Sequence, residues 1–418
     1  MKFHWFHLMP YPDLPDDFRE KNRSVWVDVD PKLYDPMVGN QAYNDYLDQL
    51  EYADQLGYDG ICVNEHHQNA YGLMPSPNIM AAALARRTSQ SKIVVMGNSV
   101  ALYNPPTRVA EEFAMLDCLS GGRLIAGFPV GTPMDTVFSY GQTPATLRDK
   151  YREGVELVMR SWQADEPFAF NGEFTQLRYV NVWPRPVQKP HPPVWIPGGG
   201  ASVDTWRWCV ENDYLYAYLS YFGYESGRHS MQSYWDVVEE MGADMNPHRA
   251  GFLQFVGVAD SDAHAEELYK EPALYFYNRC LHWYPGFTNV PGYMSIESMR
   301  RGLRSQVQTA GAISKTTSSE TTWKEIVDKA YVVCGSPQTV VDRLMDLGDA
   351  LRVGHLMLLL HFGNMSKELA YENTSRFATE VMPKLRDKFS QWDDPWYPVD
   401  PPAGAEPAPL GDARGMAV

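Results

Sequence analysis

The chain has 418 residues, of which 44 % are hydrophobic and 21 % charged, so it can bury a large core and wholesale disorder is excluded. Its net charge of −16 argues against a nucleic-acid partner and against an anionic membrane surface. The five cysteines include no CxxC pair, which indicates thiols of a reduced compartment. We expect a cytoplasmic protein, because neither a signal peptide nor an 18-residue apolar window is found.

Predicted strands and helices alternate along most of the chain. Short apolar or aromatic runs predict the strands, and apolar residues at helical spacing predict the helices. In chain order we predict a strand at 3–9, a loop at 11–40, a helix at 42–56, a strand at 61–63, a helix at 79–87, a strand at 91–96, a helix at 107–119, a strand at 123–128, a helix at 147–162, a strand at 193–197, a helix from 203, a strand near 214, a strand at 252–258, helices at 263–269 and 337–347, and a strand at 354–360.

Eight of these elements are strands. Strand–helix alternation indicates a parallel sheet with helical crossovers, and eight strands favour a closed (β/α)8 TIM barrel over an open sheet. We therefore predict an α/β protein with insertions in the loops after the strands. One domain is expected over residues 1–392, followed by an unpacked Pro/Ala-rich tail over 393–418.

Four segments whose residues could bind a ligand or take part in catalysis follow predicted strands. In such a barrel the loops after the strands build the active site. The segments are EHHQN at 65–69, GNSVALYNPP at 97–106, FPVGTP at 128–133 and PGGGAS at 197–202.

The PGGGAS segment is a candidate phosphate site. Glycines between a strand and a helix let the backbone approach a ligand, and the helix start offers free N–H groups. A flexible turn is the alternative. Neither a Walker A loop nor GxGxxG is present, so a single phosphate fits better than a pyrophosphate.

The two histidines of EHH lack the i, i+4 spacing that places a metal-binding pair on one helical face, and no metal site is predicted. Adjacent residues at a strand end point in opposite directions. One histidine facing the barrel mouth is favoured over two structural histidines.

The aromatic segment 275–293 is a candidate lid or wall of an apolar pocket. A core patch or a subunit interface is the alternative. His355 lies inside an apolar strand, which is typical of a core histidine. The residues predicted to line a substrate pocket are His7, Tyr11, Tyr284, Phe287 and His361.

Together the motifs resemble the bacterial luciferase-like flavin monooxygenases. The similarity is ordered and spans roughly residues 1–390. It includes GYDGICVNEHH, PPTRVAEEFAMLDCLSGGRLIAGFPVG, FSYG, RDKYREGVELVMRSW, PPVWIPGGGAS, LLLHFGNM and FATEVMPKLR. The resemblance implies a (β/α)8 barrel that binds reduced FMN at the carboxyl ends of its strands and uses O2 to oxygenate an organic substrate.

The resemblance also implies roles for individual residues. His66, the first histidine of the motif, would be catalytic, with Glu65 orienting it. The ring of the cofactor would lie against Asn98 and Ser99. Tyr151 would be a further cofactor contact, and the phosphate would bind at Gly199, Gly200, Ala201 and Ser202.

One departure from the luciferases themselves is Pro129-Val130, where they carry Cys-Arg. This argues against light emission with a long-chain aldehyde. We predict a two-component monooxygenase for a small apolar or aromatic molecule, with an NAD(P)H-dependent flavin reductase as partner and a homodimeric state. The alternatives are a reductase or dehydrogenase that uses the deazaflavin F420, and a flavin-binding paralogue without turnover.

Overall fold

The computed structural model describes residues 1–199, 202–288, 290–294 and 320–398. Parallel strands hydrogen-bond in the order β9-β11-β1-β2-β3-β4-β7-β8, and a β8–β9 pairing closes them into a barrel. The predicted (β/α)8 barrel is confirmed. Its strands are β1 (Lys2–Phe6), β2 (Gly60–Val63), β3 (Lys92–Val95), β4 (Leu124–Gly127), β7 (Val194–Gly198), β8 (Leu215–Tyr218), β9 (Ala250–Val258) and β11 (His355–Leu359).

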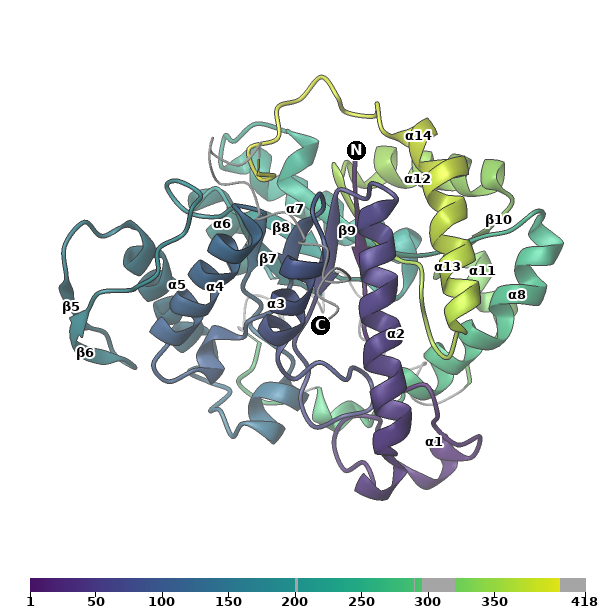
Figure 1. The fold of residues 1–418 in the computed structure, drawn as a ribbon, viewed down its shortest axis with the longest axis horizontal. Coiled ribbons are helices and arrows are strands. Elements are labelled where there is room, and N and C mark those ends of the chain that lie inside the picture. Colours follow the sequence, from purple (N-terminus) through teal and green to yellow (C-terminus); the bar gives the residue numbers. More distant parts are fainter. Residues whose placement is uncertain (200–201, 289, 295–319, 399–418) are drawn as a thin grey trace, which may run out of the picture.

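Helices surround the barrel (Figure 1). Among the described residues, no helix combines the length and the apolar character that crossing a bilayer requires. The longer helices are α2 (Pro36–Gln55), α3 (Pro77–Arg87), α4 (Thr107–Ser120), α5 (Leu147–Gln163), α6 (Val203–Glu211), α7 (Gly223–Glu240), α8 (Asp262–Tyr275), α12 (Pro337–Leu351) and α13 (Lys367–Arg376). The short ones are α1 (Phe18–Lys21), α11 (Trp323–Asp328), α14 (Met382–Leu385), the 3-10 turns Pro31–Leu33, Val100–Leu102, Pro247–Arg249 and Pro285–Phe287, and the π-type turns Met134–Ser139, Phe276–Cys280 and Phe377–Val381.

The strands are buried on both faces, as expected for a parallel sheet covered by helices. Residues in register across neighbouring strands share a face, so Cys62 and Val94 point the same way. Trp195 on β7 contacts His4 on β1, although three strands separate them in the sheet, so these side chains meet inside the barrel. The interior is thus filled with side chains rather than open.

Three strands lie outside the barrel and were not predicted. The latter half of β9 extends beyond β8 and pairs with β10 (Val332–Gly335), while β5 (Phe168–Asn171) and β6 (Gln176–Val180) form a projecting antiparallel hairpin. The hairpin's exposed residues carry little apolar signal. The apolar run of β10 is as long as that of β2, so the local pattern offered a signal for β10 that the prediction did not use.

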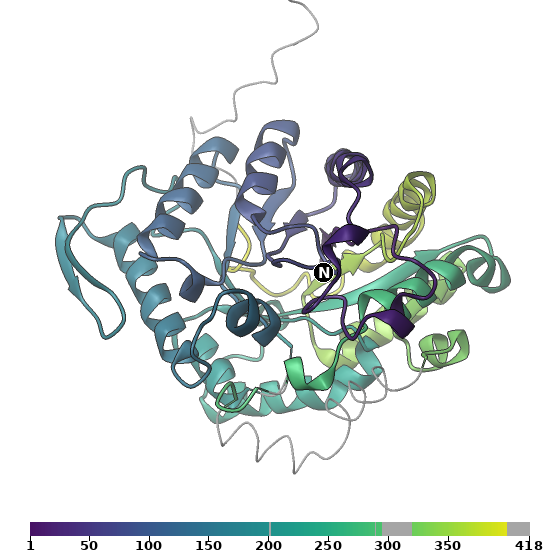
Figure 2. The same ribbon diagram turned by 90° about the horizontal axis from the view of Figure 1, so that it is seen from below.

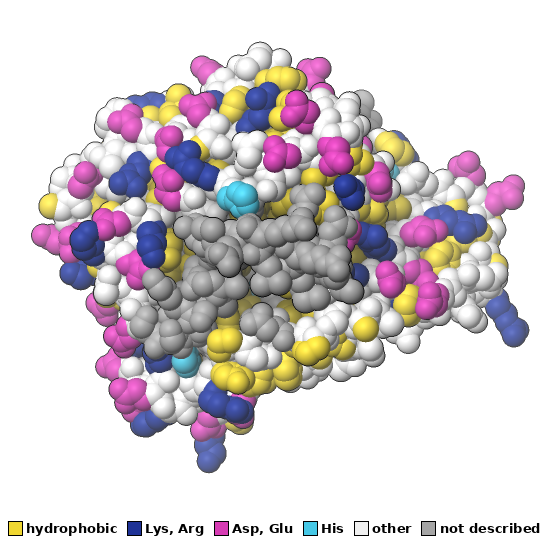
Figure 3. Space-filling view, turned by 180° about the vertical axis from the view of Figure 1, so that it is seen from behind, with side chains coloured by type: hydrophobic (Ala, Val, Ile, Leu, Met, Phe, Trp, Pro, Cys, Tyr) yellow, Lys and Arg dark blue, Asp and Glu magenta, His cyan; other side chains and the backbone are white. Residues whose placement is uncertain are grey.

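The surface opposite to the view of Figure 1 carries mixed charges. Acidic and basic side chains are interspersed over the described part of this face (Figure 3). The chain's negative net charge is therefore not gathered into one patch on this side.

The C-terminal segment 393–398 is packed against the barrel, so the unpacked tail does not begin at residue 393 as predicted. Trp396 is 3 % exposed, and its indole donates to the carbonyl of Asp213 at 2.8 Å. Its own carbonyl accepts from the indole of Trp195 at 2.9 Å. Two aromatic residues within a Pro- and Asp-rich stretch outweigh the average composition on which the tail prediction rested. Residues 399–418 lie outside the described residues.

Replacing Trp396 with alanine is expected to lower the free energy of unfolding by about 3–5 kcal/mol, because a buried indole is removed and the carbonyl of Asp213 loses its donor. Urea unfolding followed by circular dichroism measures the change. Tyr179, which is 67 % exposed, provides the control, and Tyr179→Ala should stay within about 0.5 kcal/mol of the parent. Equal small effects for both variants would contradict the packed arrangement.

Candidate active site

The carboxyl ends of β2, β3 and β4 are neighbours in the sheet, and the loops that follow them meet at one end of the barrel. In Figure 1 the chain begins at the top, and α1, which follows β1, lies at the bottom. The carboxyl ends of the barrel strands are therefore at the lower end of the barrel in that view. Figure 2 shows the same end from below. The EHH motif follows β2 directly, as the sequence predicted.

Asp135 holds the first histidine of the motif. Its Oδ2 lies 3.0 Å from His66 Nδ1, and its Oδ1 accepts from the His67 backbone amide at 2.9 Å and from the Trp26 indole at 2.7 Å. The Asp135 side chain is 3 % exposed, whereas that of His66 is 14 % exposed. Since an ionised carboxylate only accepts hydrogen bonds, it selects the His66 tautomer with the proton on Nδ1.

The second nitrogen of His66, Nε2, has no hydrogen-bond partner in the part of the chain that the structure describes. The ring stands edge-on to two aromatic side chains, with centroids 4.8 Å from Trp26 and 4.9 Å from Tyr71. Trp26 and Tyr71 stack on each other at 4.3 Å. An imidazole that packs against aromatic rings and keeps one nitrogen without a partner is suited to proton transfer beside a bound ligand.

Glu65 contacts the second histidine, His67, and does not orient His66 as expected. Its Oε1 lies 2.8 Å from His67 Nε2, and its Oε2 accepts from the Ser99 backbone amide at 2.7 Å. Tyr103 donates to the same carboxylate at 3.1 Å, and the Tyr140 hydroxyl lies 3.2 Å from His67 Nδ1. Both nitrogens of the buried His67 are therefore engaged. The two histidines diverge because consecutive residues at a strand end point to opposite sides.

The two predicted ring contacts after β3 are both buried. The amides of Asn98 and Asn78 pair with each other at 2.8 and 3.0 Å. Ser99 is tied to Glu65 through its amide, as described above, and the next residues form a 3-10 turn. The structure therefore places Ser99 beside the EHH motif but commits the Asn98 side chain to another loop.

The predicted phosphate segment follows β7. Gly199 is exposed, and a Cβ there would meet only the Leu219 carbonyl at 3.6 Å. Ser202 precedes α6, and its hydroxyl lies 2.9 Å from that of Thr205. Gly200 and Ala201 lie outside the described residues. Tyr151 on α5 is buried, and its hydroxyl donates to the Phe128 carbonyl at 2.6 Å.

Three of the predicted pocket residues lie in the packed interior. His7 is fully buried, with Nε2 3.1 Å from the Gln49 side chain and Nδ1 accepting from the Met9 amide. The His361 ring stacks on the His7 ring, with 4.9 Å between the two ring centroids. Burial lowers the pKa of His361 to about 4 and holds the pKa of His7 well below its usual value, so both are neutral at pH 7. Tyr11 is also buried and accepts from a backbone amide. This packing gives none of the three an open face toward a ligand.

The other two predicted pocket residues lie at the surface. Tyr284 is 55 % exposed, and its ring contacts that of Phe287 at 5.5 Å. Phe287 in turn contacts Phe138 at 5.1 Å, on the same π-type turn as Asp135. The neighbouring Trp283 is 6.3 Å from Trp26. Aromatic side chains of this segment thus lie beside the turn that carries Asp135 and beside Trp26.

Sequence reasoning missed Asp135, Trp26 and Asn64. Asn64 directly follows β2 and is 4 % exposed, yet neither its amide nitrogen nor its oxygen has a hydrogen-bond partner among the described residues. It continues the alternation that points Cys62 into the barrel. A carboxylate shortly after β4 was the available signal for Asp135, but nothing local marks Trp26, which lies in a long loop.

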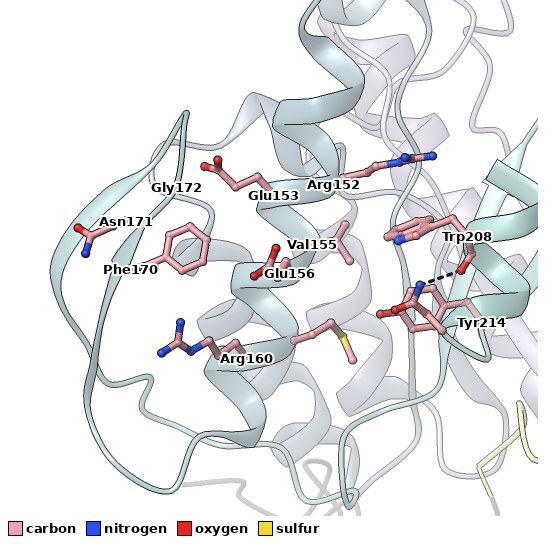
Figure 4. A pocket seen from close by; sticks show the side chains of 12 residues that line it. Arg152, Glu153, Val155, Glu156, Arg160, Phe170, Asn171, Gly172, Trp208 and Tyr214 are labelled. Carbon is pink, nitrogen blue, oxygen red and sulfur yellow. Dashed lines mark hydrogen bonds between the residues drawn. The ribbon is translucent and has the colours of Figure 1, made fainter. Parts of the chain in front are cut away.

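A separate surface cavity of about 820 Å³ lies between α5, the β5–β6 hairpin and the end of α6 (Figure 4). Arg152, Glu153 and Trp208 contribute to its walls. It lies on the outer side of the barrel helices, and no residue predicted for the site lines it. We therefore place the candidate site at the carboxyl ends of the strands and not in this cavity.

Residues 26–352 match the family model described as "Luciferase-like monooxygenase", which is more than half of the chain. The chain belongs to the luciferase-like monooxygenase family. The oxygenase component of flavin-dependent trigonelline monooxygenase of Acinetobacter baylyi is 24 % identical over 370 residues, covering 87 % of this chain and 95 % of the relative. This similarity supports a flavin-dependent monooxygenase.

Solved structures agree on the luciferase-like fold. The oxygenating constituent of 3,6-diketocamphane monooxygenase from Pseudomonas putida, solved in complex with FMN, superimposes with a TM-score of 0.68 at 19 % identity, covering 92 % of this chain and 98 % of that one.

The F420-dependent glucose-6-phosphate dehydrogenase of Kineococcus radiotolerans is 30 % identical over 173 residues, covering 39 % of this chain and 49 % of the relative. The family therefore includes both flavin and deazaflavin enzymes.

Proposed function

We propose that this luciferase-like monooxygenase uses reduced FMN, supplied by a separate NAD(P)H-dependent flavin reductase, and O2 to oxygenate a small apolar or aromatic molecule. The observation that carries the proposal is the His66–Asp135 pair, which leaves the second nitrogen of an imidazole packed against Trp26 and Tyr71 without a partner among the described residues. The trigonelline relative is an oxygenase component, which supports a partner reductase. A homodimer is also proposed, and light scattering tests it.

The residues present fit a flavin. The unpartnered amide of Asn64 offers one donor and one acceptor in a buried position, which matches the alternating polar edge of a flavin ring. The open backbone at Gly199 and the helix start after Ser202 offer N–H groups to a single phosphate. When bound, the reduced flavin supplies the electrons that activate O2.

His66 and its neighbours supply the proton handling and the dry surroundings. Asp135 keeps the proton of the neutral ring on Nδ1, so Nε2 is available to take a proton from, or after protonation return one to, a group at the Trp26–Tyr71 wall. The two aromatic rings exclude water from that side of the imidazole. Glu65 and His67 act through the backbone of Ser99 and hold the loop after β3 in place.

The aromatic side chains beside the Asp135 turn and beside Trp26 favour an apolar or aromatic substrate. Aromatic side chains bind such molecules by burying area and by stacking.

Cofactor choice is tested by binding and by isotope incorporation. The purified protein is titrated anaerobically with reduced FMN and with reduced F420, and we expect at least about tenfold tighter binding of reduced FMN. With a flavin reductase, NADH and 18O2, a panel of cyclic ketones and aromatic amines should yield a product carrying one labelled oxygen atom.

A preference for reduced F420, together with hydride transfer to a substrate without O2 consumption, would overturn the proposal in favour of the deazaflavin alternative. Binding of oxidised FMN with no response to the reductase would instead indicate a flavin-binding paralogue.

A further inference from the structure

A second group of histidines lies at the opposite end of the barrel from His66. His355 is the first residue of β11, and His248 lies in the 3-10 turn that leads into β9, so both stand at the amino ends of strands. Asp394 reaches them from the packed C-terminal segment 393–398. The function proposed above uses none of these three residues.

The geometry of the three side chains is not that of ordinary hydrogen bonding. His248 Nδ1 lies 3.4 Å from Asp394 Oδ2, and His355 Nε2 lies 3.3 Å from Asp394 Oδ1. Both distances exceed the usual donor–acceptor distance of an N–H···O hydrogen bond, which is about 2.7–3.2 Å. All four atoms are buried without a hydrogen-bond partner among the described residues.

These side chains are also deeply buried. His355 is fully buried, His248 is 4 % exposed, and the Asp394 side chain is 12 % exposed. Buried polar atoms that lack partners destabilise a fold, because their hydration is lost without replacement. Four such atoms converging on one point indicate a missing partner between them.

We propose that His248, His355 and Asp394 bind one Zn²⁺ ion, which fastens the C-terminal segment to the amino end of the barrel. Two nitrogens and a carboxylate are ligands that zinc uses. With metal–ligand distances of about 2.0–2.1 Å, neighbouring ligand atoms in a tetrahedral site are about 3.3–3.4 Å apart. His248 Nδ1–Asp394 Oδ2 and His355 Nε2–Asp394 Oδ1 are each close to this separation, and one ligand atom from each of the three residues lies within 4.8 Å of the others.

The surroundings hold the two imidazoles in place. His4 Nε2 lies 3.0 Å from His355 Nδ1, the ring nitrogen that faces away from Asp394. Metal-binding histidines are commonly held through their second nitrogen in this way. Trp195 packs edge-on to His355 at 4.9 Å. A Cβ at Gly354 would come within 2.5 Å of His248 Nδ1, so the glycine leaves room for that ring.

Other charges near the site are accounted for. The N-terminal amine of Met1 donates to the carbonyls of Arg386 and Lys388. Lys2 Nζ lies 3.7 Å from Asp59. Neither cation forms an ion pair with Asp394 within the described residues, which leaves the carboxylate for a divalent ion.

Metal analysis of the full-length protein, expressed without a polyhistidine tag, tests the proposal. After dialysis against buffer with Zn²⁺ and then without it, we expect one equivalent of zinc per chain. Replacement by Co²⁺ should produce the visible absorption of tetrahedral cobalt. Asp394→Asn should lose the metal, whereas Asp393→Asn, at the exposed neighbouring position, should retain it. His4→Gln should weaken zinc binding about 10–100-fold.

Absence of stoichiometric zinc from the parent protein would overturn the proposal, as would full retention of zinc by Asp394→Asn, which would move the ion elsewhere. If Asp394→Asn does not fold, the cobalt spectrum and the melting temperature of the parent protein decide. A melting temperature that rises with Zn²⁺ and falls with a chelator supports the site, and an unchanged one opposes it. This readout is independent of the flavin and of turnover.

Discussion

Replacing Asp135 with asparagine is expected to lower turnover about 100-fold or more while reduced-flavin affinity changes only a few-fold. The asparagine amide would present an N–H group to His66 Nδ1, and the ring would then carry its proton on Nε2, the nitrogen that is otherwise free to accept one. A comparable change of tautomer in the serine proteases lowers kcat by about 10⁴. Steady-state kinetics with a fixed supply of reduced flavin measure the effect.

His66→Ala should lower turnover by about 10²–10⁴, the usual contribution of a general acid or base. The double variant should be no slower than His66→Ala alone, because Asp135 acts through His66. The pH profile of kcat should shift in Asp135→Asn, which a purely structural role would not cause. Asp149→Asn, at an exposed position on α5, is the matched control. Full turnover in His66→Ala would remove this histidine from the mechanism.

Replacing Arg123 with methionine is expected to lower the free energy of unfolding by about 3–5 kcal/mol. Arg123 is 3 % exposed, and burial lowers its pKa below the ordinary arginine value. Its guanidinium connects α3, α4 and β3 by donating to the carbonyls of Ala85, Thr88, Ser91 and Ser120 and to the Thr88 hydroxyl. Methionine fills a similar volume but leaves these buried acceptors without donors.

Urea unfolding of the flavin-free protein measures this change, with an unaltered m-value if the unfolded state is unaffected. Arg123→Lys should recover only part of the loss, because an ammonium cannot reach all the acceptors that the planar fork reaches. Arg178→Met, at an exposed position of β6, should change stability by less than about 0.5 kcal/mol. A small effect at Arg123 would show that water replaces the guanidinium.

Local patterns were sufficient for most of the fold. Short apolar runs predicted β2 within one residue and also the buried strand β11. A strand that is buried on both faces consists of consecutive apolar residues, which can be recognised in the sequence. The start of α2 was predicted too late. Its first turn is defined by Asp35, which caps the Met37 amide, and by Pro36, and neither contributes to apolar periodicity.

The sequence by itself determined the barrel, the position of EHH at a strand end and the divergence of its two histidines, since each follows from the spacing of neighbouring residues. Tertiary structure alone decided that Asp135 is the partner of His66 and that Glu65 is the partner of His67. It also brought together His248 and Asp394, which are far apart in the chain. Such pairs depend on barrel closure and on how each loop folds over the strand ends, and local periodicity carries no information about either.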